Sequence, residues 1–140
     1  MSGPIQISLK AGERIYINGA VVRADRKVTL QLLNDVVFIL ENHVMQAEET
    51  TTPLRQLYFV VQALLMDPRN ADATRMLFRQ MLASTMASFT SHEIRAELLV
   101  IVGLVDEDSA FEALKRLRAL FPREAAILEG PPPVESSRAA

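Results

Sequence analysis

The sequence contains no cysteine among its 140 residues. Disulfides, thiolate metal sites and cysteine nucleophiles are therefore excluded. Apolar runs such as residues 98–102 fall far short of the roughly 20 residues that a membrane-spanning helix needs. The first ten residues also lack the basic start and long apolar stretch of a secretory signal. We therefore expect a soluble, cytoplasmic protein without a membrane segment.

A surplus of positive charge is missing as well. The formal net charge is −2 at pH 7, and lysine and arginine nearly balance the acidic residues in both halves of the chain. Proteins that hold nucleic acid by their overall charge are strongly basic. Any nucleic-acid site in this chain must therefore be a local patch that folding assembles.

Motifs of catalysis and metal binding are absent too. The sequence has no P-loop, no GxGxxG and no serine in a nucleophile elbow. His43 and His92 are not spaced as a metal pair, and we interpret them as a loop contact and a surface residue. The acidic run 106–108 lacks calcium-loop spacing and is interpreted as a solvated turn. We expect no enzymatic activity, no cofactor and no metal.

The first part of the chain has the period-two pattern of strands. Asn18-Gly19 is a strong hairpin signal because both residues tolerate positive φ. Residues 35–40 are nearly all apolar, which is typical of a buried strand. Apolar residues alternate at Ile5, Ile7 and Leu9, at Ile15 and Ile17, and at Val28, Leu30 and Leu32. The pattern predicts about five short antiparallel strands, in a meander or small barrel, over residues 1–50.

The second part has helical signals. Thr52 is a capping residue before Pro53, and a helix is expected from there to Asp67. Three more helices are predicted at about 70–89, 91–105 and 109–121, with capping boxes at Thr90 and Glu93 and at Ser109 and Glu112, and Pro122 ending the last.

These elements predict an α+β fold. The expected organisation is an antiparallel β subdomain at 1–50, a subdomain of about four helices at 51–128, and a disordered tail at 129–140, which is rich in proline and serine.

The basic residues of the first part lie in sequence around the turns between the predicted strands. Because hairpin ends converge, these basic residues would share one rim and could bind phosphates or exposed bases. The alternative is ordinary solubilising charge that protects edge strands from pairing. The candidate RNA-binding residues are Lys10, Arg14, Arg23, Arg26 and Lys27.

A second candidate surface lies on the helices. Tyr58 and Phe59 on the first helix, and Met76 and Met81 on the second, are candidates for binding a partner helix, since methionine side chains adapt to different partners. Core packing is the simpler interpretation of the aromatic pair and of most methionines.

Two segments, LKAGERIYINGA at 9–20 and TTPLRQLYFVVQ at 51–62, are more specific than general hairpin or helix patterns. Through them the chain, over about residues 5–121, resembles the FlbT family of alphaproteobacterial flagellum biosynthesis repressors. The resemblance implies a post-transcriptional regulator that associates with the 5′ untranslated region of flagellin mRNA and lowers its translation or lifetime. It also implies FlaF as a partner, and an effect that is positive in some relatives. The alternative is an adaptor that binds flagellin or FlaF and affects the mRNA indirectly.

A weaker similarity links residues 7–30 to the carbon storage regulators, small RNA-binding β-proteins that form intertwined dimers. An apolar strand, Lys10, the turn at Gly12-Glu13 and an alternating second strand follow the same pattern. The similarity implies the strand order and a homodimer. It does not carry over the RNA-reading residues, because Leu9 stands where an arginine is expected.

Overall fold

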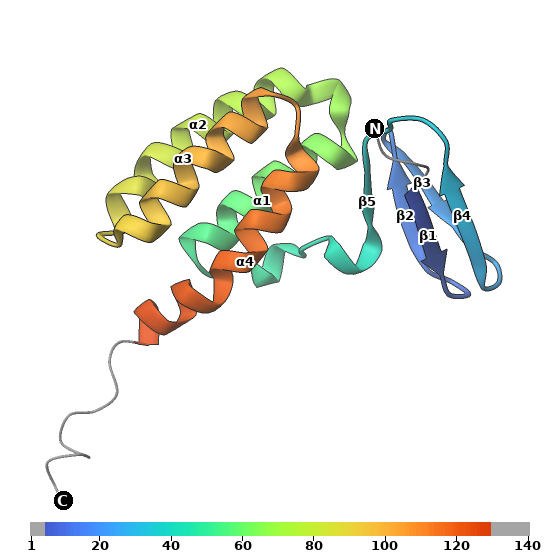
Figure 1. Ribbon diagram of the computed structural model, residues 1–140, viewed down its shortest axis with the longest axis horizontal. Coiled ribbons are helices and arrows are strands. Elements are labelled where there is room, and N and C mark those ends of the chain that lie inside the picture. Colours follow the sequence, from blue (N-terminus) through green and yellow to red (C-terminus); the bar gives the residue numbers. More distant parts are fainter. Residues whose placement is uncertain (1–4, 130–140) are drawn as a thin grey trace, which may run out of the picture.

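The computed structural model describes residues 5–129 and shows the predicted α+β fold, with strands first and helices after them (Figure 1). The strands are β1 (Ile5–Leu9), β2 (Arg14–Ile17), β3 (Ala20–Arg23), β4 (Val28–Leu32) and β5 (Phe38–Leu40). The helices are α1 (Pro53–Met66), α2 (Ala71–Ser88), α3 (His92–Asp106) and α4 (Ala110–Glu129), with single 3₁₀ turns at Glu41–His43, Ala47–Glu49 and Pro68–Asn70. The expected tail lies outside the described residues, except for Glu129, which ends α4.

Among the described strands, only β2 and β3 pair in the order of the chain. β1 pairs with β4, and β2 lies between β3 and β5, so the antiparallel strands form two small sheets. The alternating side chains of β1 put Ile7 and Leu9 into a core that they share with Ile15 and Phe38. A pattern of period two fixes which face is buried but does not identify the neighbouring strand.

The predicted turn at Asn18-Gly19 joins β2 to β3. Both residues have positive φ, 50° and 86°, as a two-residue hairpin turn requires. The turn is also held from outside, because Asn18 donates its backbone N–H to the Val37 carbonyl and accepts the Val37 N–H on its side chain. The strand expected over 35–40 is consequently shorter, and only Phe38–Leu40 pairs with β2.

Two of the helix starts follow from capping. The Thr52 side chain accepts the Arg55 N–H ahead of Pro53, as predicted. At α3 the prediction of Thr90 as the capping residue is wrong. Ser91 is the N-cap and accepts the Ile94 N–H, one residue later than expected.

The prediction that Pro122 ends the last helix is also wrong. α4 continues through this proline to Glu129. Proline removes one hydrogen bond from a helix interior. Just beyond it, the buried Glu124 carboxylate accepts hydrogen bonds from the Thr52 hydroxyl and the Leu54 N–H. These contacts tie the last turns of α4 to the start of α1 and offset the loss.

The larger core lies among the helices, and β5 joins it to the strands. Ile39 belongs to the helical core, whereas its neighbour Phe38 belongs to the smaller core of the β part. From α4, Phe111 packs against Phe38 with ring centroids 5.1 Å apart. Within the described residues, no helix is long and apolar enough to cross a membrane.

Candidate nucleic-acid interface

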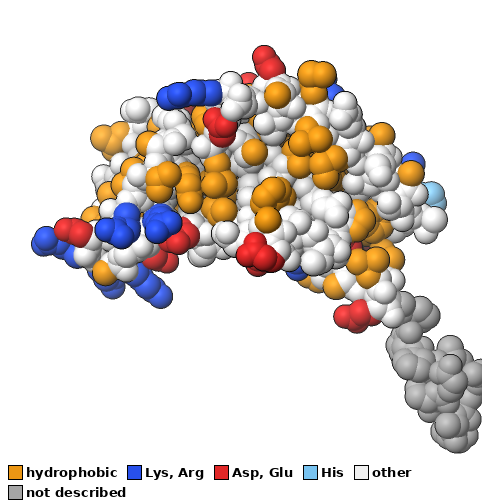
Figure 2. Space-filling view, turned by 180° about the vertical axis from the view of Figure 1, so that it is seen from behind, with side chains coloured by type: hydrophobic (Ala, Val, Ile, Leu, Met, Phe, Trp, Pro, Cys, Tyr) orange, Lys and Arg blue, Asp and Glu red, His pale blue; other side chains and the backbone are white. Residues whose placement is uncertain are grey.

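The five candidate cations meet at one end of the β part. The turn after β1 and the turn after β3 lie side by side, because Gly12 donates its backbone N–H to Ala24 and Ala24 donates to Glu13. Figure 2 shows lysine and arginine side chains gathered at the end of the molecule that carries the strands. We call this surface the cationic rim, and it consists of Lys10, Arg14, Arg23, Arg26 and Lys27, all exposed.

The centre of the rim is a pair of like charges. Arg14 in β2 lies directly opposite Arg23 in β3 in the antiparallel register. Like charges at such positions destabilise the sheet. Among residues 5–129, the only ion pair that involves a rim residue is between Arg26 and Asp25, and both of those side chains are 82% exposed. The guanidinium groups of the central pair are therefore available to an anion.

Two glutamates next to the rim have backbone partners. Glu13 accepts the Lys10 N–H at 2.7 Å, and Glu41 accepts the Arg14 N–H at 2.9 Å. These carboxylates fix the turn and the β2–β5 junction. Their negative charges also lower the positive electrostatic potential of the rim.

A small cavity lies just beyond Glu41, between the 3₁₀ turn Glu41–His43 and helices α1 and α4. We call it the His43 pocket. Its volume is about 120 Å³, and its lining includes Asn42, His43, Glu49, Tyr58, Arg118 and Phe121.

The polar groups of this pocket form a chain of contacts. Arg118 donates to the Tyr58 hydroxyl at 2.9 Å, and that hydroxyl donates to the His43 carbonyl at 2.5 Å. The His43 Nδ1 is buried and makes no hydrogen bond with the described residues. Burial lowers the pKa of His43, and the Arg118 charge lowers it further. Burial raises the pKa of Tyr58, against the opposing hydrogen bond and charge of Arg118. His43 is therefore held neutral beside a cation.

The four partner-binding candidates are not on one surface. Tyr58 is 1% exposed and belongs to the core. Phe59, the next residue, is 38% exposed. On α2, Met81 packs against the helical core, whereas Met76 is 63% exposed. The structure therefore leaves Phe59 and Met76 accessible from different helices.

Phe59 lines a hollow of about 460 Å³ between α1 and the segment that follows β5. Tyr16, Ala63 and Met66 contribute apolar surface, and Glu48 and Asp67 are acidic and exposed. A hollow of this size and lining suits apolar side chains of a partner that also carries basic residues.

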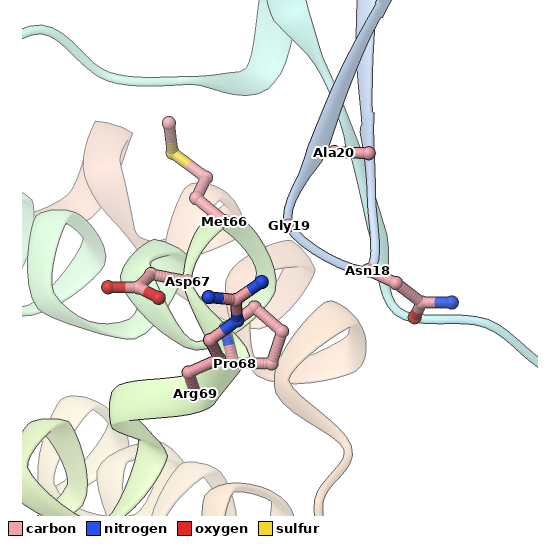
Figure 3. A pocket seen from close by; sticks show the side chains of 7 residues that line it. All are labelled: Asn18, Gly19, Ala20, Met66, Asp67, Pro68 and Arg69. Carbon is pink, nitrogen blue, oxygen red and sulfur yellow. The ribbon is translucent and has the colours of Figure 1, made fainter.

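A second hollow of similar volume separates the β2–β3 turn from the end of α1 (Figure 3). Asn18, Gly19 and Ala20 form one wall, and residues 66–69 form the other. Asp67 is engaged by Asn70, whose side-chain amide donates to it. A Cβ on Gly19 would lie 3.5 Å from the Pro68 ring, so the two parts of the chain meet here at the edge of the hollow.

Arg118, the cation of the His43 pocket, was missed at the sequence level. It occupies a position in α4 that a helical pattern treats as ordinary surface. The acidic run 106–108 contacts α2, through the ion pairs Asp106–Arg79 and Asp108–Arg75. Within residues 5–129, no three histidine or acidic side chains are grouped so that they could hold a metal ion.

Comparison with known proteins finds a family whose members are similar to this chain. The model of the family described as flagellar protein FlbT matches residues 5–128. A probable flagellum biosynthesis repressor protein FlbT of Mesorhizobium japonicum is 52% identical over 130 residues, which cover 93% of this chain and 88% of the relative. The proteins of the same name from Chelativorans sp. and Brucella ovis are each 53% identical, over 91% and 93% of this chain and 88% and 86% of their own lengths. No solved structure matches.

Proposed function

Because the chain belongs to the FlbT family, we propose that it represses flagellum biosynthesis by binding the 5′ untranslated region of flagellin mRNA in the cytoplasm. The cationic rim is the contact surface, and binding lowers translation or lifetime of the message. The names of the relatives support the repressor role. The proposed position of the RNA-binding site is inferred from the cationic rim.

The observation that supports the rim most strongly is the Arg14–Arg23 pair. The two arginines are directly paired across the β2–β3 ladder, and within residues 5–129 neither forms an ion pair with an acidic side chain. A phosphate between them would remove the repulsion and gain charge-assisted hydrogen bonds. Arginine suits this role because its planar fork matches phosphate oxygens and stacks on unpaired bases.

The test is a variant in which Arg14, Arg23 and Lys27 are changed to alanine. A matched control removes three helical cations, Arg69, Lys115 and Arg123, and changes the net charge equally. We expect the rim variant to bind the flagellin leader at least about tenfold more weakly. The slope of log K against log salt should become shallower by about 2, since each phosphate contact on single strands contributes about 0.7. If the rim variant binds like the control, the rim is not the RNA surface.

An adaptor is the second candidate function, and the hollow beside Phe59 favours it. In this alternative, FlaF or flagellin docks an apolar helix face there, and the message is affected indirectly. Phe59→Glu would place a charge in the hollow, and Gln80→Glu on the exposed side of α2 is the control. Loss of a micromolar complex with FlaF or flagellin in the first variant alone would support the adaptor. Absence of any complex with wild type would reject it.

The regulator acts as a homodimer in this proposal. β3 supports it, because all four of its residues are exposed and it is hydrogen-bonded to β2 alone among the described strands. Val21 and Val22 are 59% and 39% exposed, which is unusual for an unprotected edge. Sedimentation equilibrium should show a dimer that Val22→Lys dissociates. A monomer at protein concentrations well above those used to measure RNA binding would contradict it.

A further inference from the structure

We propose that the His43 pocket is a base-reading subsite, which takes one unpaired base of an RNA whose phosphates lie on the cationic rim. The inference rests on the proposed RNA binding and adds a specificity site to it. In this arrangement the rim positions the RNA through phosphate contacts, and the pocket provides sequence specificity through a base contact.

The 3₁₀ turn that lines the pocket is linked to the rim through Glu41. β5 ends at Leu40, which pairs with Ile15, and the next residue, Glu41, accepts the Arg14 N–H at 2.9 Å. His43 follows two residues later in the same 3₁₀ turn. We therefore infer that an RNA strand bound at Arg14 extends to the pocket along the 3₁₀ turn.

The dimensions and the polar groups suit a base edge. A volume of about 120 Å³ equals roughly four water molecules at 30 Å³ each, which is the scale of one planar ring. The exposed Asn42 side chain makes no hydrogen bond with the described residues and offers both a donor and an acceptor. Glu49 can accept from an exocyclic amine.

His43 supplies the observation that a structural role leaves unexplained. A buried polar atom without a partner costs free energy, and its persistence calls for a ligand or another compensation. As a neutral ring, His43 can either donate or accept at Nδ1, depending on its tautomer.

Arg118 completes the site from the α4 side. It is held by the Tyr58 hydroxyl at 2.9 Å, and its guanidinium lies 5.9 Å from the Tyr58 ring centroid. Phe121 already faces Arg55, 4.5 Å from its centroid, and meets Tyr58 edge to face. The Tyr58 and Phe121 rings already pack against each other. The incoming base is therefore recognised mainly by hydrogen bonds and by stacking on the His43 ring and the Arg118 guanidinium.

The experiment measures discrimination between the flagellin leader and a scrambled RNA of equal length. The variants are His43→Ala and Asn42→Ala, and His92→Ala is the matched control because His92 is exposed at the start of α3. Loss of one base contact should reduce the ratio of affinities about tenfold in the two pocket variants. The salt dependence of leader binding should stay at its wild-type slope, since no phosphate contact is removed. His92→Ala should keep the wild-type ratio.

A second readout does not depend on the variants folding. The chain has only two histidines, so their ring signals are resolved by NMR in the wild-type protein. Leader RNA should shift the His43 signal and leave that of His92 in place. An unchanged His43 signal at saturation, or full discrimination in both folded pocket variants, overturns the subsite. A wild-type protein that binds neither RNA overturns the proposed function itself, together with the subsite.

Discussion

The Glu124 carboxylate in α4 accepts the backbone N–H of Leu54, in the first turn of α1, at 2.8 Å. The same carboxylate accepts the Thr52 hydroxyl at 2.5 Å, and it is 1% exposed. A residue 70 positions away therefore completes the N-terminal cap of α1. The start of the helical part is fixed by its end.

Replacing Glu124 by alanine should therefore destabilise the fold. The change leaves the Leu54 N–H buried without an acceptor, and we expect a loss of about 1–3 kcal/mol in the free energy of unfolding. Urea denaturation measures it, with the exposed Glu129→Ala as a control expected to stay within about 0.5 kcal/mol. Equal stability of the two variants would show that the contact does not stabilise the fold.

The buried Gln62 gives a second stability prediction. Its amide donates to the Met45 carbonyl at 2.9 Å and accepts the Met45 N–H at 2.8 Å. Gln62→Ala leaves both backbone groups unpaired, so a loss of about 2–6 kcal/mol in the free energy of unfolding is expected from the two groups. Gln56→Ala, on the exposed side of α1, is the control for helix propensity. A midpoint of denaturation shared by both variants would reject this anchoring role.

The β2–β3 turn should respond to loss of glycine. Gly19 has φ of 86°, a conformation that a Cβ strains. Gly19→Ala is expected to cost about 1 kcal/mol, and the Cβ would meet the Pro68 ring at 3.5 Å only in ordinary contact. Gly103→Ala, in α3 with open space around it, should instead be neutral or stabilising. Thermal melts of the two variants measure the difference, and an opposite order contradicts the turn assignment.

The lowered pKa of His43 predicts a pH dependence. Its ordinary value is 6.5, and burial with the Arg118 charge lowers it in the folded protein. Below about 6.5 the unfolded chain takes up a proton that the folded chain does not, so stability falls as the pH decreases from there to the folded pKa. Between pH 7 and pH 5, the free energy of unfolding should therefore decrease less for His43→Gln than for wild type. Identical decreases would indicate that His43 titrates normally.

The sequence predicted the elements better than their partners. Period two and the Asn18-Gly19 turn identified the strands, because these signals are local. Pairing of β1 with β4 depends on how two small sheets close over Ile15, which no local pattern encodes. The prediction that Pro122 ends α4 was wrong for the same reason, because the compensating contacts of Glu124 come from the distant residues 52 and 54.

The candidate site divides in the same way. Convergence of the five cations followed from the hairpin ends, because turns on the same end of a sheet are neighbours. The His43 pocket could not be predicted, since Arg118 and Tyr58 reach it from α4 and α1 across 60 residues of sequence. The four partner-binding candidates do not share one surface, for a related reason. Neighbours in a helix such as Tyr58 and Phe59 point in different directions, and only packing decides which is buried.

The proposed function requires direct and specific recognition of RNA. Equilibrium binding of the purified wild-type protein to the flagellin 5′ leader, against a scrambled RNA of equal length and across a salt series, tests it most directly. We predict tighter binding to the leader, with affinity that falls steeply as salt rises. Equal binding to both RNAs, or binding to neither, would contradict the claim and leave the adaptor, with FlaF and flagellin as the partners to test.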